Sequence, residues 1–304
     1  MYPHGGGGPG MSLSARLGIG VMKAIARLPL PVLRSVGVGL GHLLHAAARP
    51  RRRVVDANLR VCFPEMTEEE RRRISRQTFV YVAQSWLDRS WLWHAPRQVV
   101  ESRLALRGAK EDLDELANGE QAIILFAPHF YGLDAGATTL TMHMARPSMT
   151  IYTTQRDRMI DDWARAGRTR FGSVTALERT DGVKPVLHRL RRGEVLYLLP
   201  DMDFGPSQSI FVPFFGVPAA TVPSLSRFSQ LGRAIVMPVL TRLTPAGYEV
   251  ELLPRWTDFP TGDIVADTTH MNEMLEGYIR AMPSQYYWVH RRFKTRPEGE
   301  PSVY

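Results

Sequence analysis

His129 and Asp134 are the residues whose types and spacing most directly suggest chemistry. They follow the apolar run 122–127, which is typical of a buried strand, and they precede a stretch of helical pattern. An imidazole whose second nitrogen is held by a carboxylate stays in one tautomer and accepts a proton readily, which suits a general base acting on a hydroxyl. Spacing alone is a weak argument, because 9 histidines and 30 acidic residues in 304 positions give about one such pair by chance. The competing interpretation makes Asp134 a helix cap and His129 an ordinary loop residue.

Little in the sequence points to covalent or thiolate chemistry. Cys62 is the only cysteine, so an intrachain disulfide and a zinc site built from several thiolates are excluded. It lies far from His129 along the chain, and no serine occupies a Gly-x-Ser-x-Gly turn. We therefore expect no enzyme nucleophile, no metal site and no bound cofactor.

Short apolar runs alternate with helical stretches over most of the chain. Strands that alternate with helices favour an α/β fold with a mostly parallel central sheet flanked by helices. Ligands of such a sheet bind at the carboxyl ends of the strands, which is where His129 and Asp134 fall. The predicted strands are 121–127, 149–154, 195–200, 234–242 and 248–253; the predicted helices are 135–144, 157–171, 183–192, 224–231 and 268–282, and 53–93 is also helical, with a capping box at Thr67 and Glu70.

Positive charge is concentrated at the two ends of the chain. The formal net charge is +8, residues 1–53 carry eight Lys or Arg and no acidic residue, and residues 290–296 repeat the bias. Such ends suit anionic partners: lipid headgroups, phosphorylated substrates, an acidic carrier protein or nucleic acid. No nucleic-acid motif occurs elsewhere, so we expect no nucleic-acid partner.

Residues 11–50 are predicted to associate with a membrane. The longest uncharged run, 35–48, has 14 residues, whereas a span needs about 20. The preferred interpretation of this segment is therefore an anchor that lies in the plane of the membrane, and the second interpretation is a marginal membrane span. The arginine cluster 51–53 argues against a secretory signal and favours the cytoplasmic face. The alternative interpretation is that these arginines belong to an ordinary solvated turn. Residues 1–10 are expected to be a disordered tail.

Five blocks of sequence, in order, resemble the late (secondary) acyltransferases of lipid A biosynthesis. That family lies within the lysophospholipid acyltransferase superfamily, whose shared signature is His-x4-Asp/Glu. The resemblance implies a glycerolipid acyltransferase-like α/β fold and an acyltransferase domain over 51–304. Lipid A acyltransferases commonly carry Glu where this chain has Asp134, as the glycerolipid acyltransferases do. The blocks are 53–65, 127–134, 199–206, 210–221 and 285–297.

The resemblance also implies a reaction, a place and partners. By this resemblance we expect a fatty acyl chain to pass from acyl carrier protein to the hydroxyl of an acyl chain on a lipid A precursor, at the cytoplasmic face of the inner membrane. His129 is expected to take the proton of the attacking hydroxyl, and Asp134 is expected to orient the imidazole. The thioester is already activated, so neither a covalent enzyme intermediate nor a cofactor beyond the acyl-acyl carrier protein co-substrate is required. Two alternatives stay open: a lysophospholipid or glycerolipid acyltransferase, and a non-catalytic basic protein that binds membrane surfaces.

Asp201 and Asp203 follow a predicted strand, and three interpretations of them stay open. By resemblance they order an active-site loop or contact substrate. An Asp-x-Asp pair after a strand also occurs in metal-dependent glycosyltransferases. Two aspartates beside glycine and proline are, thirdly, typical of a plain turn.

Two further groups are candidate substrate-binding residues. Arginines bind phosphate well through their planar guanidinium, although single exposed arginines are usually only solvated. Phenylalanines in the block 211–216 would line an apolar wall for the acyl chain, or would simply pack in the core. These candidates are Arg156, Arg168, Arg170, Phe214 and Phe215.

Overall fold

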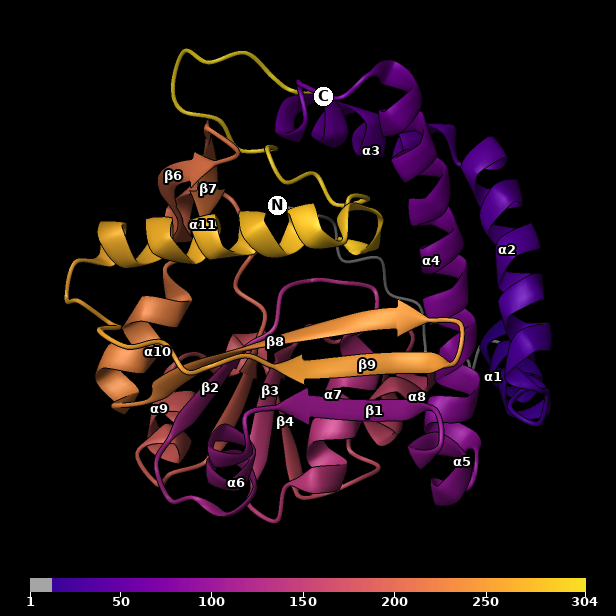
Figure 1. The fold of residues 1–304 in the computed structure, drawn as a ribbon, viewed down its shortest axis with the longest axis horizontal. Coiled ribbons are helices and arrows are strands. Elements are labelled where there is room, and N and C mark those ends of the chain that lie inside the picture. The colour runs from indigo at the N-terminus through magenta and orange to yellow at the C-terminus, as the bar shows by residue number, and fades with distance from the viewer. Residues whose placement is uncertain (1–12) are drawn as a thin grey trace.

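A seven-stranded sheet runs through the middle of the molecule (Figure 1). The computed structural model describes residues 13–304. The strand order is β1-β9-β8-β2-β5-β3-β4, and every neighbouring pair is parallel except β8 and β9, so the expected mostly parallel sheet is confirmed. The strands are β1 (Leu104–Gly108), β2 (Ile123–Phe126), β3 (Ser148–Tyr152), β4 (Val174–Glu178), β5 (Val195–Leu198), β8 (Ile235–Thr244) and β9 (Gly247–Leu252), and a separate antiparallel hairpin joins β6 (Ile210–Phe214) to β7 (Val217–Thr221).

Apolar side chains fill both faces of the central strands. On β2, Ile124 and Phe126 belong to one core cluster, whereas Ile123 and Leu125 belong to another. This alternation follows from the two-residue period of a strand, and helices covering both faces explain why the strand is apolar throughout. The helices on the first face are α9 (Lys184–Leu190), α10 (Ser224–Gly232) and α11 (Ile264–Ala281); α6 (Lys110–Asn118) and α7 (Leu133–His143) cover the second.

The predicted elements are present with shifted ends. Helix α11 begins at Ile264 rather than at residue 268, and α8 spans Arg158–Arg168 rather than 157–171. The predicted helical stretch 53–93 is two helices, α3 (Arg49–Cys62) and α4 (Glu68–His94), and the Thr67–Glu70 capping box starts the second, as expected. Strands β1 and β4, the β6–β7 hairpin, α6 and the short α5 (Arg97–Glu101) were not predicted.

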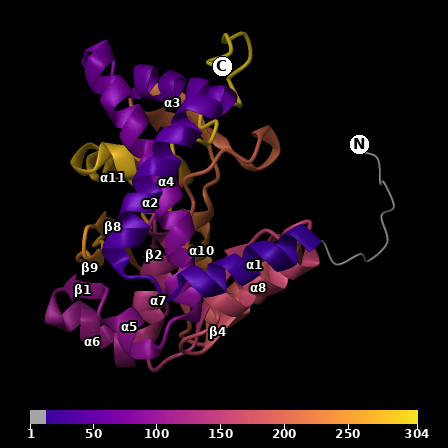
Figure 2. The same ribbon diagram turned by 90° about the vertical axis from the view of Figure 1, so that its right-hand side faces the viewer.

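The N-terminal segment packs against the α/β domain. Helices α1 (Leu13–Ile25) and α2 (Leu30–Ala47) lie along α8 and α4 respectively (Figures 1 and 2). Arg34 of α2 forms a buried ion pair with Asp88 of α4 at 2.5 Å, and the Tyr248 hydroxyl donates to the same carboxylate at 2.7 Å. Within residues 13–304, no helix combines the length and apolar character that crossing a membrane requires. The marginal span considered from the sequence is therefore not found, and the tail expected over 1–10 lies outside the described residues.

Candidate active site

His129 and Asp201 meet at the carboxyl ends of two neighbouring parallel strands. His129 follows β2 and Asp201 follows β5, and these strands pair in register. The Nδ1 atom of His129 lies 2.6 Å from Oδ1 of Asp201, and the backbone N–H of His129 donates to Oδ2 of the same carboxylate at 3.0 Å. A carboxylate at Nδ1 places the hydrogen on that nitrogen and leaves the Nε2 lone pair for a substrate proton.

The environment of Asp201 favours its charged form. The residue is fully buried, and burial by itself raises the pKa of a carboxyl group. The charge that His129 carries when protonated, together with hydrogen bonds from His129 and the Tyr286 hydroxyl, outweighs burial and holds the pKa of Asp201 below its usual value. Asp201 is therefore a fixed anionic partner for the ring.

The expected pairing of His129 with Asp134 is wrong. Asp134 sits in the first turn of α7, where Oδ2 accepts from Nε of Arg89 at 2.7 Å and Oδ1 accepts from Nε of Arg168 at 3.0 Å. Burial raises the pKa of Asp134, but the two guanidinium groups prevail and hold it well below its usual value. Both carboxylate oxygens are engaged by arginines from α4 and α8, whereas the end of β5 brings Asp201 to the imidazole.

The C-terminal segment packs against the loop that carries His129. The backbone N–H of Tyr287 donates to the carbonyl of His129 at 2.9 Å, and the two rings lie 6.2 Å apart between centroids. Asn58 of α3, fully buried, donates to the carbonyls of Trp288 and His290, each at 2.8 Å. The residue pair Phe130 and Tyr286 adds an isolated β-bridge. The sequence block 285–297 is thus part of the site's framework.

Asp203 orders the loop that carries Asp201. Its carboxylate accepts from the backbone N–H groups of Gly205 at 2.8 Å and Thr295 at 2.7 Å, and from the Thr295 hydroxyl at 2.9 Å. Its own backbone N–H donates to Nε2 of His290 at 3.2 Å. Protein donors therefore occupy the carboxylates of the Asp-x-Asp pair, and among residues 13–304 no group of three or more His, Cys, Asp or Glu is arranged to hold a metal ion.

The three candidate arginines have different surroundings. Arg168 pairs with Asp134 and keeps about a third of its side chain exposed. Arg170 donates to the backbone carbonyls of Leu92 and Ala95 at the end of α4, which is a structural contact. Arg156 is exposed beyond the end of β3. Of these three candidates, therefore, only Arg168 contacts Asp134.

The two candidate phenylalanines pack into the core. Phe214 is fully buried, with its ring 5.9 Å from that of Phe293 and the Arg292 guanidinium 4.9 Å above it. Phe215 has a positive φ of 51° in the hairpin turn, contacts the ring of Phe63 and lies under the Arg280 guanidinium. The core-packing interpretation fits these contacts.

Several residues of the site were not predicted from the sequence. Arg89 lies within a long helix and stacks its guanidinium 4.7 Å from the Trp86 ring, a position that no motif marks. Asn58 and His290 fall inside the blocks 53–65 and 285–297. The family resemblance therefore pointed to these segments but assigned no role to either residue. Asp201 was identified as a loop or substrate residue rather than as the partner of the histidine.

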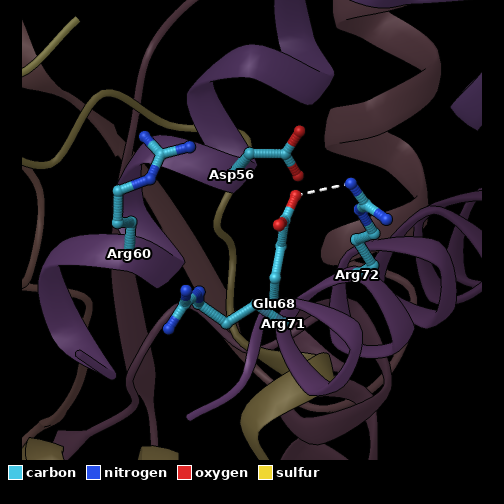
Figure 3. Close-up of a pocket in the computed structure, with 5 residues that line it drawn as sticks. All are labelled: Asp56, Arg60, Glu68, Arg71 and Arg72. Atoms are coloured by element: carbon cyan, nitrogen blue, oxygen red, sulfur yellow. Dashed lines mark hydrogen bonds and ion pairs between the residues drawn. The ribbon is translucent and has the colours of Figure 1, made fainter. Parts of the chain in front are cut away.

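A surface pocket between α3 and α4 lies apart from these residues (Figure 3). It has a volume of about 290 Å³, and Glu68 forms an ion pair with Arg72 within it. Arg71, on its wall, donates to the backbone carbonyls of Phe63 and Met66 and so joins the end of α3 to α4. The pocket contributes none of the candidate catalytic residues.

A histidine held by a buried aspartate at the edge of a parallel α/β sheet is an arrangement suited to enzymes that move a proton during group transfer. The sequence model of the bacterial lipid A biosynthesis acyltransferase family matches residues 11–295. The chain belongs to this family, which supports an acyltransferase acting in lipid A biosynthesis.

Individual relatives agree with that assignment. The lipid A biosynthesis lauroyltransferase of Escherichia coli (strain K12) is 35% identical over 291 residues, covering 95% of this chain and 94% of the relative. A lipid A biosynthesis acyltransferase of Haemophilus influenzae is 31% identical, with coverage of 93% and 88%. The lipid A biosynthesis palmitoleoyltransferase of E. coli is 29% identical, with coverage of 94% and 93%.

Proposed function

We propose that this protein transfers a fatty acyl chain from acyl-acyl carrier protein to a hydroxyl of an acyl chain on a lipid A precursor. Membership of the lipid A acyltransferase family supports the acceptor. The observation that carries the mechanism is the His129–Asp201 pair at the strand ends, since a hydroxyl must lose a proton as it attacks a thioester.

The reaction uses the Nε2 atom of His129, because the other ring nitrogen, Nδ1, is engaged by Asp201. The Nε2 atom accepts the proton of the acceptor hydroxyl while the hydroxyl oxygen bonds to the thioester carbonyl carbon. The carbon–sulfur bond then breaks, and the imidazolium returns the proton to the departing thiolate, so the products are an ester and a thiol. Asp201 keeps the hydrogen on Nδ1 and stays ionised throughout.

Asp134 has a different role in this proposal. It holds Arg89 and Arg168 side by side through the two oxygens of one carboxylate. Two guanidinium groups on one carboxylate leave a net positive charge, and both arginines keep part of their side chains exposed, 24% and 32%. A phosphate group of the substrate would bind there, since guanidinium offers paired donors for its oxygens.

The proposed location is the cytoplasmic face of the inner membrane, with α1 and α2 lying in the plane of the lipid surface. Apolar side chains on these helices are exposed to solvent, among them Leu13 at 80%, Leu17 at 69% and Leu43 at 63%. Arg16, Lys23 and other basic residues accompany them, with no acidic residue before Asp56. Exposed apolar area beside cationic groups favours binding to anionic lipid.

The test supplies the purified protein with acyl-acyl carrier protein and either a tetraacylated lipid A precursor or a lysophospholipid. We expect transfer to the lipid A precursor, a loss of about 10²-fold or more in His129→Ala, and unchanged transfer in His188→Ala, an exposed histidine of α9. Transfer only to the lysophospholipid would overturn the acceptor, and full activity of His129→Ala would overturn the mechanism. Transfer to neither acceptor would favour a non-catalytic membrane-surface protein.

A further inference from the structure

His290 is a second imidazole tied to the loop that holds His129. The backbone N–H of Asp203 donates to Nε2 of His290 at 3.2 Å, and Asp201, two residues earlier, holds the ring of His129. From the other side, the backbone N–H of His290 donates to the carbonyl of Tyr287 at 3.1 Å, and Tyr287 in turn donates to the carbonyl of His129. Two separate segments therefore join the two histidines.

The hydrogen bond from Asp203 fixes the tautomer of His290. A backbone N–H can only donate, so Nε2 must be the acceptor, and the hydrogen of the neutral ring lies on Nδ1. Burial and the charge of Arg292 lower the pKa of His290 to about 4, with His129 also lowering it and Asp203 and Asp201 opposing them. At neutral pH the ring is uncharged and presents one N–H.

That N–H is available to a ligand. The His290 side chain is partly exposed, and among residues 13–304 the hydrogen bond found to its ring engages Nε2 and leaves Nδ1 without a protein partner. Asn58 holds the carbonyl of His290 at 2.8 Å, and Asn58 itself accepts from the Tyr304 hydroxyl at 2.5 Å. These hydrogen bonds hold the backbone of His290 in place, as a preorganised site requires.

We propose that the Nδ1–H of His290 donates a hydrogen bond to the carbonyl oxygen of the acyl thioester as negative charge develops there. The inference rests on the proposed function, because it assumes a thioester donor and His129 as the base. When His129 takes the hydroxyl proton it becomes positive, and a charged neighbour would oppose that step. A neutral imidazole supplies a hydrogen bond to the oxyanion without adding a second positive charge.

Two substitutions separate the donor from the structural contact. His290→Gln can place an amide oxygen near the Nε2 position, so it can keep the bond from Asp203 while losing the Nδ1–H. His290→Asn can place an amide N–H near the Nδ1 position and keep the donor. We expect His290→Gln to lower kcat by about 10²-fold to 10³-fold, as loss of one oxyanion donor does, with both KM values within about threefold of the unsubstituted enzyme.

Rescue and stability decide between a catalytic and a structural role. We expect kcat of His290→Asn to be at least about tenfold higher than that of His290→Gln. The Tm of both variants is measured so that the rates refer to folded enzyme. His188→Ala, on the exposed surface of α9, is the matched control. A kcat of His290→Gln within threefold of the unsubstituted enzyme, or equal losses in the Gln and Asn variants, would overturn the proposal.

A second measurement does not depend on turnover. Nitrogen-15 NMR of histidine-labelled protein should show Nε2 of His290 as an acceptor and Nδ1 carrying the hydrogen, unchanged between pH 6 and pH 8, whereas a ring protonated at pH 7 would overturn the inference. The unsubstituted enzyme separates the two proposals. Its failure to acylate either acceptor overturns the proposed function, and normal transfer with a fully active His290→Gln overturns only the role of His290.

Discussion

Asp201 binds His129 twice, through Nδ1 of the ring at 2.6 Å and through the backbone N–H at 3.0 Å. The two residues are 72 positions apart in the chain and meet because β2 and β5 are neighbours in the sheet. The acidic residue five positions after the histidine, Asp134, instead joins Arg89 and Arg168. One carboxylate therefore orients the imidazole, and the other organises positive charge.

Asp201→Asn should reduce kcat by about 10²-fold to 10⁴-fold, because the amide no longer fixes the tautomer or offsets the charge of the imidazolium. The rate is measured with both substrates at saturation, and Tm confirms folding. Asp162→Asn, whose side chain on α8 is 69% exposed, is the matched control and should keep full activity. If Asp201→Asn kept most of its kcat while folded Asp134→Asn lost it, the orienting carboxylate would be Asp134 after all.

Asp134→Asn should lower the free energy of unfolding by about 3 kcal/mol at pH 7, because two partly buried guanidinium groups lose their counter-charge. The pKa of Asp134 is lowered in the folded protein relative to the ordinary value of 3.8. The carboxylate therefore stabilises the fold above about pH 4 and less so as the pH falls below that value. Urea unfolding of both proteins at several pH values should show their difference shrinking in acid. A difference that stayed constant down to pH 3 would contradict this account.

The sequence was most informative where local pattern and burial coincide. Strands β2 and β5 are apolar at every position because helices cover both faces, and both were predicted. The edge strands β1 and β4 mix charged and apolar residues, so neither carries that signal. The partner of His129 depends on which strand lies beside β2, and spacing along the chain does not contain that information.

Gly41→Ala should weaken the packing of α2 on α4. A Cβ at Gly41 would lie 2.4 Å from Cα of Val80 and 2.9 Å from the carbonyl oxygen of Phe79, both backbone atoms that cannot rotate away. The helices must then separate, at a cost of about 1–3 kcal/mol in unfolding free energy. Gly39→Ala, where a Cβ meets no atom within 4 Å, is the control and should be neutral or stabilising by up to about 1 kcal/mol. Equal stabilities of the two variants in urea would mean that the close approach is not maintained in solution.

Leu17→Glu should weaken binding to vesicles of anionic phospholipid. Leu17 of α1 is 69% exposed, and burying a leucine side chain in lipid is worth about 1.5–3 kcal/mol, which corresponds to about tenfold or more in affinity. Leu43→Glu on α2 should act in the same direction, since its side chain is 63% exposed. The control is Leu231→Glu on α10, 49% exposed and distant from both helices in the chain, which should bind as the unsubstituted protein does. Flotation with vesicles at several salt concentrations measures the binding. If Leu231→Glu lost as much affinity for the vesicles as Leu17→Glu, the effect would come from the added negative charge alone and not from the loss of an apolar contact made by α1.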